Sequence, residues 1–177
     1  MRKKIIFMIL IILAMLAETN LARADLVFDS GYNIFDDSYP YYDEVWVIND
    51  AHLDVLGGAM WKLELMHYAT ANIYDGEILL RLAIRDNTTA SIHGGIFPKL
   101  GAWDDSLVDL YAYDVTYHPT GGLDNHGWIE GTYYSNDTPF SFSLDTDATY
   151  SHISIVPEPT SILLLSVGMI GVRAKCA

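Results

Sequence analysis

Residues 53–110 of the chain read LDVLGGAMWKLELMHYATANIYDGEILLRLAIRDNTTASIHGGIFPKLGAWDDSLVDL, and one pattern occurs in them four times. Each copy begins with an apolar, a polar and an apolar residue, as in Leu53-Asp54-Val55, Ala71-Asn72-Ile73, Ala90-Ser91-Ile92 and Val108-Asp109-Leu110. The central polar residues are 18, 19 and 18 positions apart. A fixed period of this length is typical of a repeat protein, in which each copy packs mainly against its neighbours.

Two further features recur in the first three copies. A turn pair follows the apolar residues, and a cation then precedes a leucine; the turn pairs are Gly57-Gly58, Asp75-Gly76 and Gly94-Gly95, and the cations with their leucines are Lys62-Leu63, Arg81-Leu82 and Lys99-Leu100. The extra residue of the second copy lies between Gly76 and Arg81. Because the apolar residues recur at every second position, each copy is expected to consist of strands and turns.

The repeat predicts an all-β fold, a short parallel β-solenoid of three to four coils of 18–19 residues over residues 45–114. Each coil is expected to hold three short strands and three corners. One interior row should contain Leu53, Ala71, Ala90 and Val108, and a second face should stack Met60, Ile78 and Phe97. A β-sandwich with evenly spaced strands is the alternative, but it does not explain why residue types repeat.

The segments on either side of the repeat are expected to cover its ends. Residues 25–44, rich in Tyr and Asp, are predicted to form an N-terminal cap. Residues 115–155 are predicted to form a C-terminal β cap, with antiparallel strands at 128–134 and 140–144 around the Asn136-Asp137 turn. Residues 150–155 are expected to add a third antiparallel strand.

The first 24 residues predict a secretory signal peptide with a signal helix. Arg2, Lys3 and Lys4 form its charged start, residues 5–17 are an unbroken apolar run, and Ala22-Arg23-Ala24 is the small-x-small pattern read by signal peptidase. Thirteen apolar residues are fewer than the roughly 17 to 25 that a spanning helix needs. Cleavage is therefore expected after Ala24, so that the mature chain begins at Asp25.

The last 22 residues, 156–177, have a three-part order. The motif Val156-Pro157-Glu158-Pro159-Thr160-Ser161 comes first, the apolar run 162–172 follows, and Arg173 and Lys175 form a basic end. Two prolines keep the motif extended, and the apolar run predicts a membrane helix whose basic end stays in the cytoplasm. Taken alone, the apolar run is also compatible with a C-terminal core helix.

This order resembles the PEP-CTERM sorting domain of Gram-negative bacteria. The basic end has two cations, where the family usually has a denser arginine cluster. The resemblance implies processing near the motif by the membrane enzyme exosortase. It also implies transient anchoring in the inner membrane, followed by transfer to the cell surface or the medium.

Charge and cysteine content narrow the classes of partner and site. Residues 25–156 contain four basic and 21 acidic residues, a net charge of about −17, against −13 for the whole chain. So acidic a body is expected to repel nucleic acid and anionic lipid. The only cysteine, Cys176, lies in the tail, so the body has no disulfide, thiolate metal site or cysteine nucleophile.

The body offers weak candidates for catalysis. Asp104 and Asp105, with Asp86 one coil earlier and Arg85 beside it, could bring carboxylates and a base together, as in β-helix enzymes that cleave polysaccharides. Asp is also a favoured turn residue, and no spacing fixes an acid, a base and a metal together. The six histidines are scattered, so we expect no metal site, no cofactor and no enzymatic activity.

The expected function is that of an exported, non-enzymatic protein of the bacterial surface or extracellular matrix, associated with exopolysaccharide. The alternative is a secreted carbohydrate-binding module, whose aromatic platforms would be Trp46, Trp61, Trp103, Tyr111, Tyr113 and Trp128. A polysaccharide-degrading enzyme of the β-helix type is the less favoured third class. Glycan binding separates the first two classes, and release of reducing sugar identifies the third.

Overall fold

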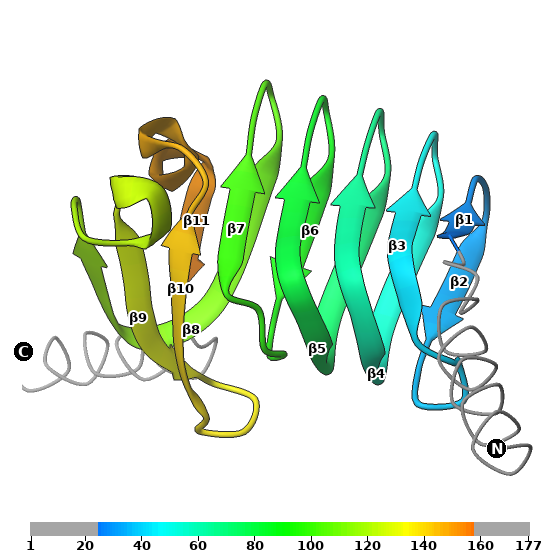
Figure 1. Ribbon diagram of the computed structural model, residues 1–177, viewed down its shortest axis with the longest axis horizontal. Helices are drawn as coiled ribbons and strands as arrows, with labels where there is room; N and C mark the ends of the chain where they lie inside the picture. The colour runs from blue at the N-terminus through cyan, green and yellow to red at the C-terminus, as the bar shows by residue number, and fades with distance from the viewer. Residues whose placement is uncertain (1–24, 158–177) are drawn as a thin grey trace, which may run out of the picture.

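The computed structural model describes residues 25–157, which are mostly β and form a β-solenoid of about five turns (Figure 1). The strands are β1 (Asp25–Phe28), β2 (Tyr32–Phe35), β3 (Tyr42–Val47), β4 (His52–Leu65), β5 (Thr70–Ile84), β6 (Thr89–Ile92), β7 (Lys99–Ala102), β8 (Leu107–His118), β9 (Trp128–Tyr133), β10 (Pro139–Leu144) and β11 (Ile153–Val156). Two short 3-10 helices, η1 (Leu123–Asn125) and η2 (Asp147–His152), lie in the last third. The predicted all-β solenoid is confirmed.

The coils have two main faces of parallel strands. The first face contains β2, β6, β11 and the N-terminal parts of β4, β5 and β8. The second face contains β1, β3, β7 and the C-terminal parts of β4 and β5, and β10 pairs with β7 at its end. The predicted interior row is confirmed, because the strand register aligns four buried side chains, Leu53, Ala71, Ala90 and Val108.

Each central coil is one long bent strand followed by a tight turn. Of the three expected corners, two are bends within β4 and β5, where the register between these strands is irregular, and the third is the tight turn. The first bend contains Gly58 and Gly76, both with positive φ. At the second bend Trp61 lies opposite two residues, Leu79 and Leu80, so the extra residue of the second copy is a local bulge.

The N-terminal segment 25–44 is part of the solenoid and not a separate cap. β2 pairs in parallel with β4, aligning Tyr32 with His52, and β1 pairs with β3. The prediction missed this coil because the segment lacks the Gly-Gly pair and the cation-leucine pair of the later copies. It still covers the core, since the ring of Tyr39 stacks on Phe35 with centroids 4.9 Å apart. The additional coil explains why the turns number about five and not three to four.

The C-terminal segment combines a hairpin with a further rung. β9 and β10 are antiparallel, as predicted, with Ile129 opposite Phe142. The third strand differs from the prediction, because β11 runs parallel to β8 and aligns Ile153 with Val108, while η2 occupies residues expected to be strand. Alternation of apolar and polar residues identifies a strand but not its direction. β11 therefore extends the first face by one rung.

The predicted signal helix (1–24) and the predicted membrane helix within 156–177 lie outside the described residues, and both stay predictions. Within residues 25–157 the structure contains no helix that is long and apolar enough to cross a membrane.

Candidate functional site

The tight turns at one edge of the solenoid share a conformation. Four consecutive turns each contain a residue with positive φ, namely Asn49 (59°), His67 (68°), Asp86 (59°) and Asp104 (60°). Asn and Asp tolerate this left-handed region better than most residues. The first residue of the turn accepts a hydrogen bond from the fourth in the turns that begin at Ile48, Met66 and Trp103, at 3.2, 3.3 and 3.2 Å.

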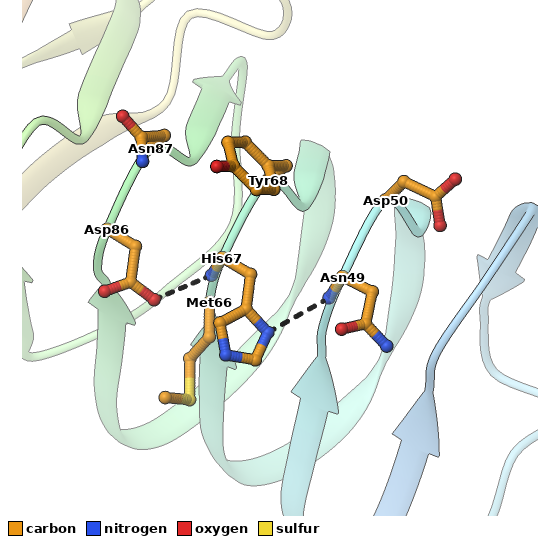
Figure 2. A pocket seen from close by; sticks show the side chains of 7 residues that line it. All are labelled: Asn49, Asp50, Met66, His67, Tyr68, Asp86 and Asn87. Atoms are coloured by element: carbon orange, nitrogen blue, oxygen red, sulfur yellow. Dashed lines mark hydrogen bonds between the residues drawn. The ribbon is translucent and has the colours of Figure 1, made fainter.

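The side chains of these four residues connect one coil to the coil before it. The backbone N–H of Asn49 donates to His67 Nδ1 at 3.4 Å, and the N–H of His67 donates to Asp86 Oδ2 at 2.8 Å (Figure 2). The N–H of Asp86 donates in the same way to Asp104 Oδ2 at 3.3 Å. We call Asn49, His67, Asp86 and Asp104 the inner turn row. Three of its side chains accept a backbone N–H of the preceding coil, whereas Asn49 Nδ2 donates to the Asp29 carbonyl oxygen at 3.4 Å.

The next residue of each turn forms a second row with a different role. Asp50, Tyr68, Asn87 and Asp105 are equivalent positions in successive coils, and all four are exposed. Their side chains make no hydrogen bond, ion pair or ring contact with residues 25–157. Figure 2 shows that Asp50, Tyr68 and Asn87 point away from the coils. We call these four residues the outer turn row.

A groove of about 690 Å³ lies along three of these turns. Both turn rows and Met66 contribute to its lining (Figure 2). Tyr68 supplies its aromatic surface and is 69% exposed. The groove therefore combines one free aromatic ring with carboxylate and amide groups.

The weak catalytic candidates of the sequence are not assembled into a site. Asp86 and Asp104 do stack in neighbouring coils, but each carboxylate accepts a backbone N–H of the preceding coil. Arg85 Nε lies 2.8 Å from Glu64 Oε1, so its charge is paired with a buried carboxylate. Within residues 25–157 no group of three or more His, Cys, Asp and Glu side chains is placed to hold a metal ion.

A polar cluster on the first face was not recognised in the sequence. Asp54 accepts hydrogen bonds from Tyr32 and from Asn72 Nδ2, the latter at 2.8 Å, and lies 2.9 Å from His52 Nε2. His52 Nδ1 is 2.7 Å from the hydroxyl of Thr70. Burial raises the pKa of Asp54, but the three hydrogen bonds outweigh it and the net pKa is lowered. The signal was present, because His52 and Asp54 are two residues apart and Thr70 and Asn72 follow one period later.

The order Thr70, His52, Asp54 resembles the hydroxyl, imidazole and carboxylate of a catalytic relay. Such a relay also needs donors for the oxyanion. The N–H groups around these residues belong to the parallel ladder between β2, β4 and β5, on the outer surface of a sheet. The cluster therefore ties three coils together, and within residues 25–157 its neighbouring N–H groups are committed to the sheet.

The second face carries all four basic residues of the described part of the chain. Strand register places Lys62, Arg81 and Lys99 in one column, and Arg85 directly follows the end of β5. Arg81 and Lys99 share Asp145, at 2.9 and 2.6 Å, and Lys99 also pairs with Asp124 at 2.7 Å. These hydrogen bonds, first to Asp124 and then to Asp145, raise the pKa of Lys99. The repeated cations therefore all form ion pairs with carboxylates.

Five of the six aromatic residues considered as sugar platforms are engaged within the molecule. Lys62 lies over the ring of Trp46 at 4.8 Å, and the Arg85 guanidinium lies 4.6 Å from the Trp103 ring. The Trp103 ring covers Gly101, where a Cβ would lie 2.1 Å from it. The other three contact neighbouring rings: Tyr111 with His93, Tyr113 with Tyr134, and Trp128 with His118. Trp61 is 43% exposed at the second bend.

The residues predicted to direct export lie at or beyond the ends of the described chain. Asp25 is the first residue of β1, Val156 is the last residue of β11, and Pro157 is exposed directly after it. Ala22, Ala24, Glu158, Pro159, Thr160, Ser161, Arg173 and Lys175 lie outside the described residues. The structure therefore does not describe the sorting motif as a site.

Comparison with models of known protein families, with curated proteins and with solved structures found no match to this chain.

Proposed function

We propose that this chain is an exported, non-enzymatic protein of the bacterial surface or extracellular matrix, delivered by its two terminal segments. Signal peptidase removes residues 1–24, and the tail 156–177 holds the protein in the inner membrane until exosortase processes it. The body then reaches the surface or the medium, where it associates with exopolysaccharide.

The position of the proposed sorting motif relative to the solenoid supports this proposal most directly. The motif begins at Val156, the residue at which β11 ends, and Pro157 after it is exposed. Processing beyond Val156 can therefore occur without removing a described strand from the solenoid.

The chemistry of the body supports a binding or structural role over catalysis. The stacked carboxylates, the Asp54 cluster and the cation column each satisfy groups within the fold. Its net charge of about −17 disfavours nucleic acid and anionic lipid as partners. Packing, ion pairs and hydrogen bonds hold the body together without any cysteine.

The test compares the unaltered protein with Glu158→Ala in a host that encodes an exosortase, by cell fractionation and intact mass. The unaltered protein should lose Cys176 with its tail and appear at the surface or in the medium. Glu158→Ala should stay in the inner membrane with the tail attached, because the motif is changed while the apolar run is not. Glu77→Ala, at an exposed position of β5, is the matched control and should behave as the unaltered protein. Mature surface protein that retains Cys176 would contradict the sorting proposal.

A carbohydrate-binding module is the second candidate function. The observation that favours it is the outer turn row, in which Tyr68 is free for a ligand. The six aromatic residues singled out in the sequence favour it less, since five of them are engaged within the molecule.

A further inference from the structure

The outer turn row is a part of the molecule whose residues the fold does not explain. The turn itself is formed by its backbone and by the inner turn row, so the position of Tyr68 requires no large side chain. Other exposed tyrosines, such as Tyr32 and Tyr74, stack on the ring of His52 or His93. Tyr68 is more exposed than either, at 69%, and contacts no ring among the described residues. A single exposed aromatic residue is common on protein surfaces, but Tyr68 lies in a groove with uncommitted polar side chains beside it, and this combination indicates a binding surface.

The groups beside Tyr68 fit a sugar better than an apolar ligand. An exposed phenol ring offers a flat face to the C–H groups of a pyranose. Asp50, one coil earlier, can accept two hydroxyl hydrogen bonds, and Asn87, one coil later, can both donate and accept. The side chains of Asp50 and Asn87 are uncommitted, and the two residues lie in the turns on either side of Tyr68 (Figure 2).

The outer turn row also runs along the solenoid axis. Neighbouring parallel strands are about 4.8 Å apart, so the three steps from Asp50 to Asp105 span roughly 14 Å along the solenoid axis. An extended sugar chain lying along this axis would meet one side chain of the row with each coil. A single small ligand would use only part of the groove.

The negative charge of the outer turn row favours neutral or amine-bearing sugar chains over acidic ones. The row has an aspartate at each end, Asp50 and Asp105, and belongs to a body with a net charge of about −17. A polymer of uronic acids would be repelled, whereas neutral or amine-bearing sugars would not. We propose that the outer turn row binds a polysaccharide without acidic groups, stacked on Tyr68 and aligned with the solenoid axis. This names the ligand class for the proposed function and rests on it.

The experiment measures depletion of the full-length chain, kept in nonionic detergent, by insoluble polysaccharide. Three probes are used: cellulose as a neutral glucan, chitosan as an amine-bearing chain, and cross-linked alginate as an acidic chain. We expect binding to cellulose or chitosan and none to alginate. Tyr68→Ala should weaken that binding about tenfold or more, and Tyr68→Trp should retain it, since the flat ring is kept. Thermal unfolding should be the same for both variants and the unaltered chain, because the Tyr68 side chain has no partner among residues 25–157.

Trp61→Ala is the matched control, because Trp61 is also an exposed aromatic residue but lies at the second bend, away from the tight turns. It should bind as the unaltered chain does. Binding that is unaffected by Tyr68→Ala, lost equally in Trp61→Ala, strongest on alginate, or absent from all three probes would overturn the proposal. The fractionation experiment on Glu158→Ala is independent, so a failure of binding and a failure of sorting are distinguishable.

Discussion

The first bend, here called the corner, and the tight-turn edge both contain residues with positive φ, but they use different residue types. At the corner, Gly58 and Gly76 have φ of 81° and 105°. At the tight turns, non-glycine residues such as His67 and Asp86 adopt φ of 68° and 59°. The corner brings neighbouring backbones so close that a Cβ on Gly76 would lie 3.0 Å from the carbonyl oxygen of Gly57. The tight turns leave room, and side chains there reach the next coil.

This difference predicts different roles for the two regions: the corner serves the stacking of the coils, and the tight turns can also bind a ligand. The positions of Gly58 and Gly76 leave no room for a side chain, so these glycines have no side-chain group to offer a ligand. The tight turn uses one side chain per coil for stacking and leaves the next one, in the outer turn row, unused. Ligand binding is therefore expected at the tight-turn edge, where the side chains of the outer turn row make no contact with residues 25–157.

Replacing a corner glycine should have the largest effect. Gly76→Ala combines an unfavourable φ with the close approach of the Gly57 carbonyl, so we expect about 3 kcal/mol of destabilisation in denaturant unfolding. Gly31→Ala is the matched control, because Gly31 also has a positive φ, of 70°, but a Cβ there meets nothing within 4 Å. It should cost only about 1 kcal/mol. Equal costs for the two substitutions would show that close approach does not distinguish the corner.

Removing an inner-row side chain should have an intermediate effect. Asp86→Ala leaves the His67 N–H without its acceptor and places a less suitable residue at positive φ, so about 1–2 kcal/mol should be lost. Asp86→Asn should recover most of it, since Asn also accepts a hydrogen bond and tolerates this conformation. Asn87→Ala, in the outer row, should change the free energy of unfolding by less than about 0.5 kcal/mol. A larger effect at Asn87 than at Asp86 would reverse the assignment of the two rows.

The smallest expected effect is on the pH dependence of stability, through one histidine of the first face. His93 lies between the rings of Tyr74 and Tyr111, at 4.8 and 4.0 Å, and burial lowers its pKa. Its contribution to stability is therefore present above the unfolded-state pKa of about 6.5 and is lost as the pH falls from there through the folded-state pKa. His93→Phe keeps the stacking and should flatten the melting temperature between pH 7.5 and 5 relative to the unaltered chain. An unchanged pH profile would exclude His93 as a contributor.

Repetition made most of the solenoid predictable from the sequence. The 18-residue period placed Val108 in the same interior row as Leu53, and the bulge opposite Trp61 followed from one spacing of 19. The first coil was missed because stacking requires only that Phe35 point inward, and not that the glycine and cation features be present. The direction of β11 was missed because it depends on η2 returning the chain to the first face, which no local pattern encodes.

The candidate site was less predictable than the fold. Aromatic content drew attention to tryptophans, yet Trp46 and Trp103 are covered by cations that the same repeat supplies. Tyr68 stood out in no motif, since its importance depends on what its side chain does not contact. Whether a turn residue is committed or free depends on the direction of its side chain, and both rows are polar in the sequence.

The account depends most on the claim that adjacent turn rows have separate roles, and one paired measurement tests it. Asp86→Ala and Tyr68→Ala are compared in both melting temperature and retention by insoluble cellulose or chitosan. Asp86→Ala should lower the melting temperature by several degrees and still bind at temperatures where it is folded, because its carboxylate is committed to the His67 N–H. Tyr68→Ala should keep the melting temperature and lose about tenfold or more in binding. If the two variants lose stability and binding in the same proportion, the rows are one structural unit and the account is wrong.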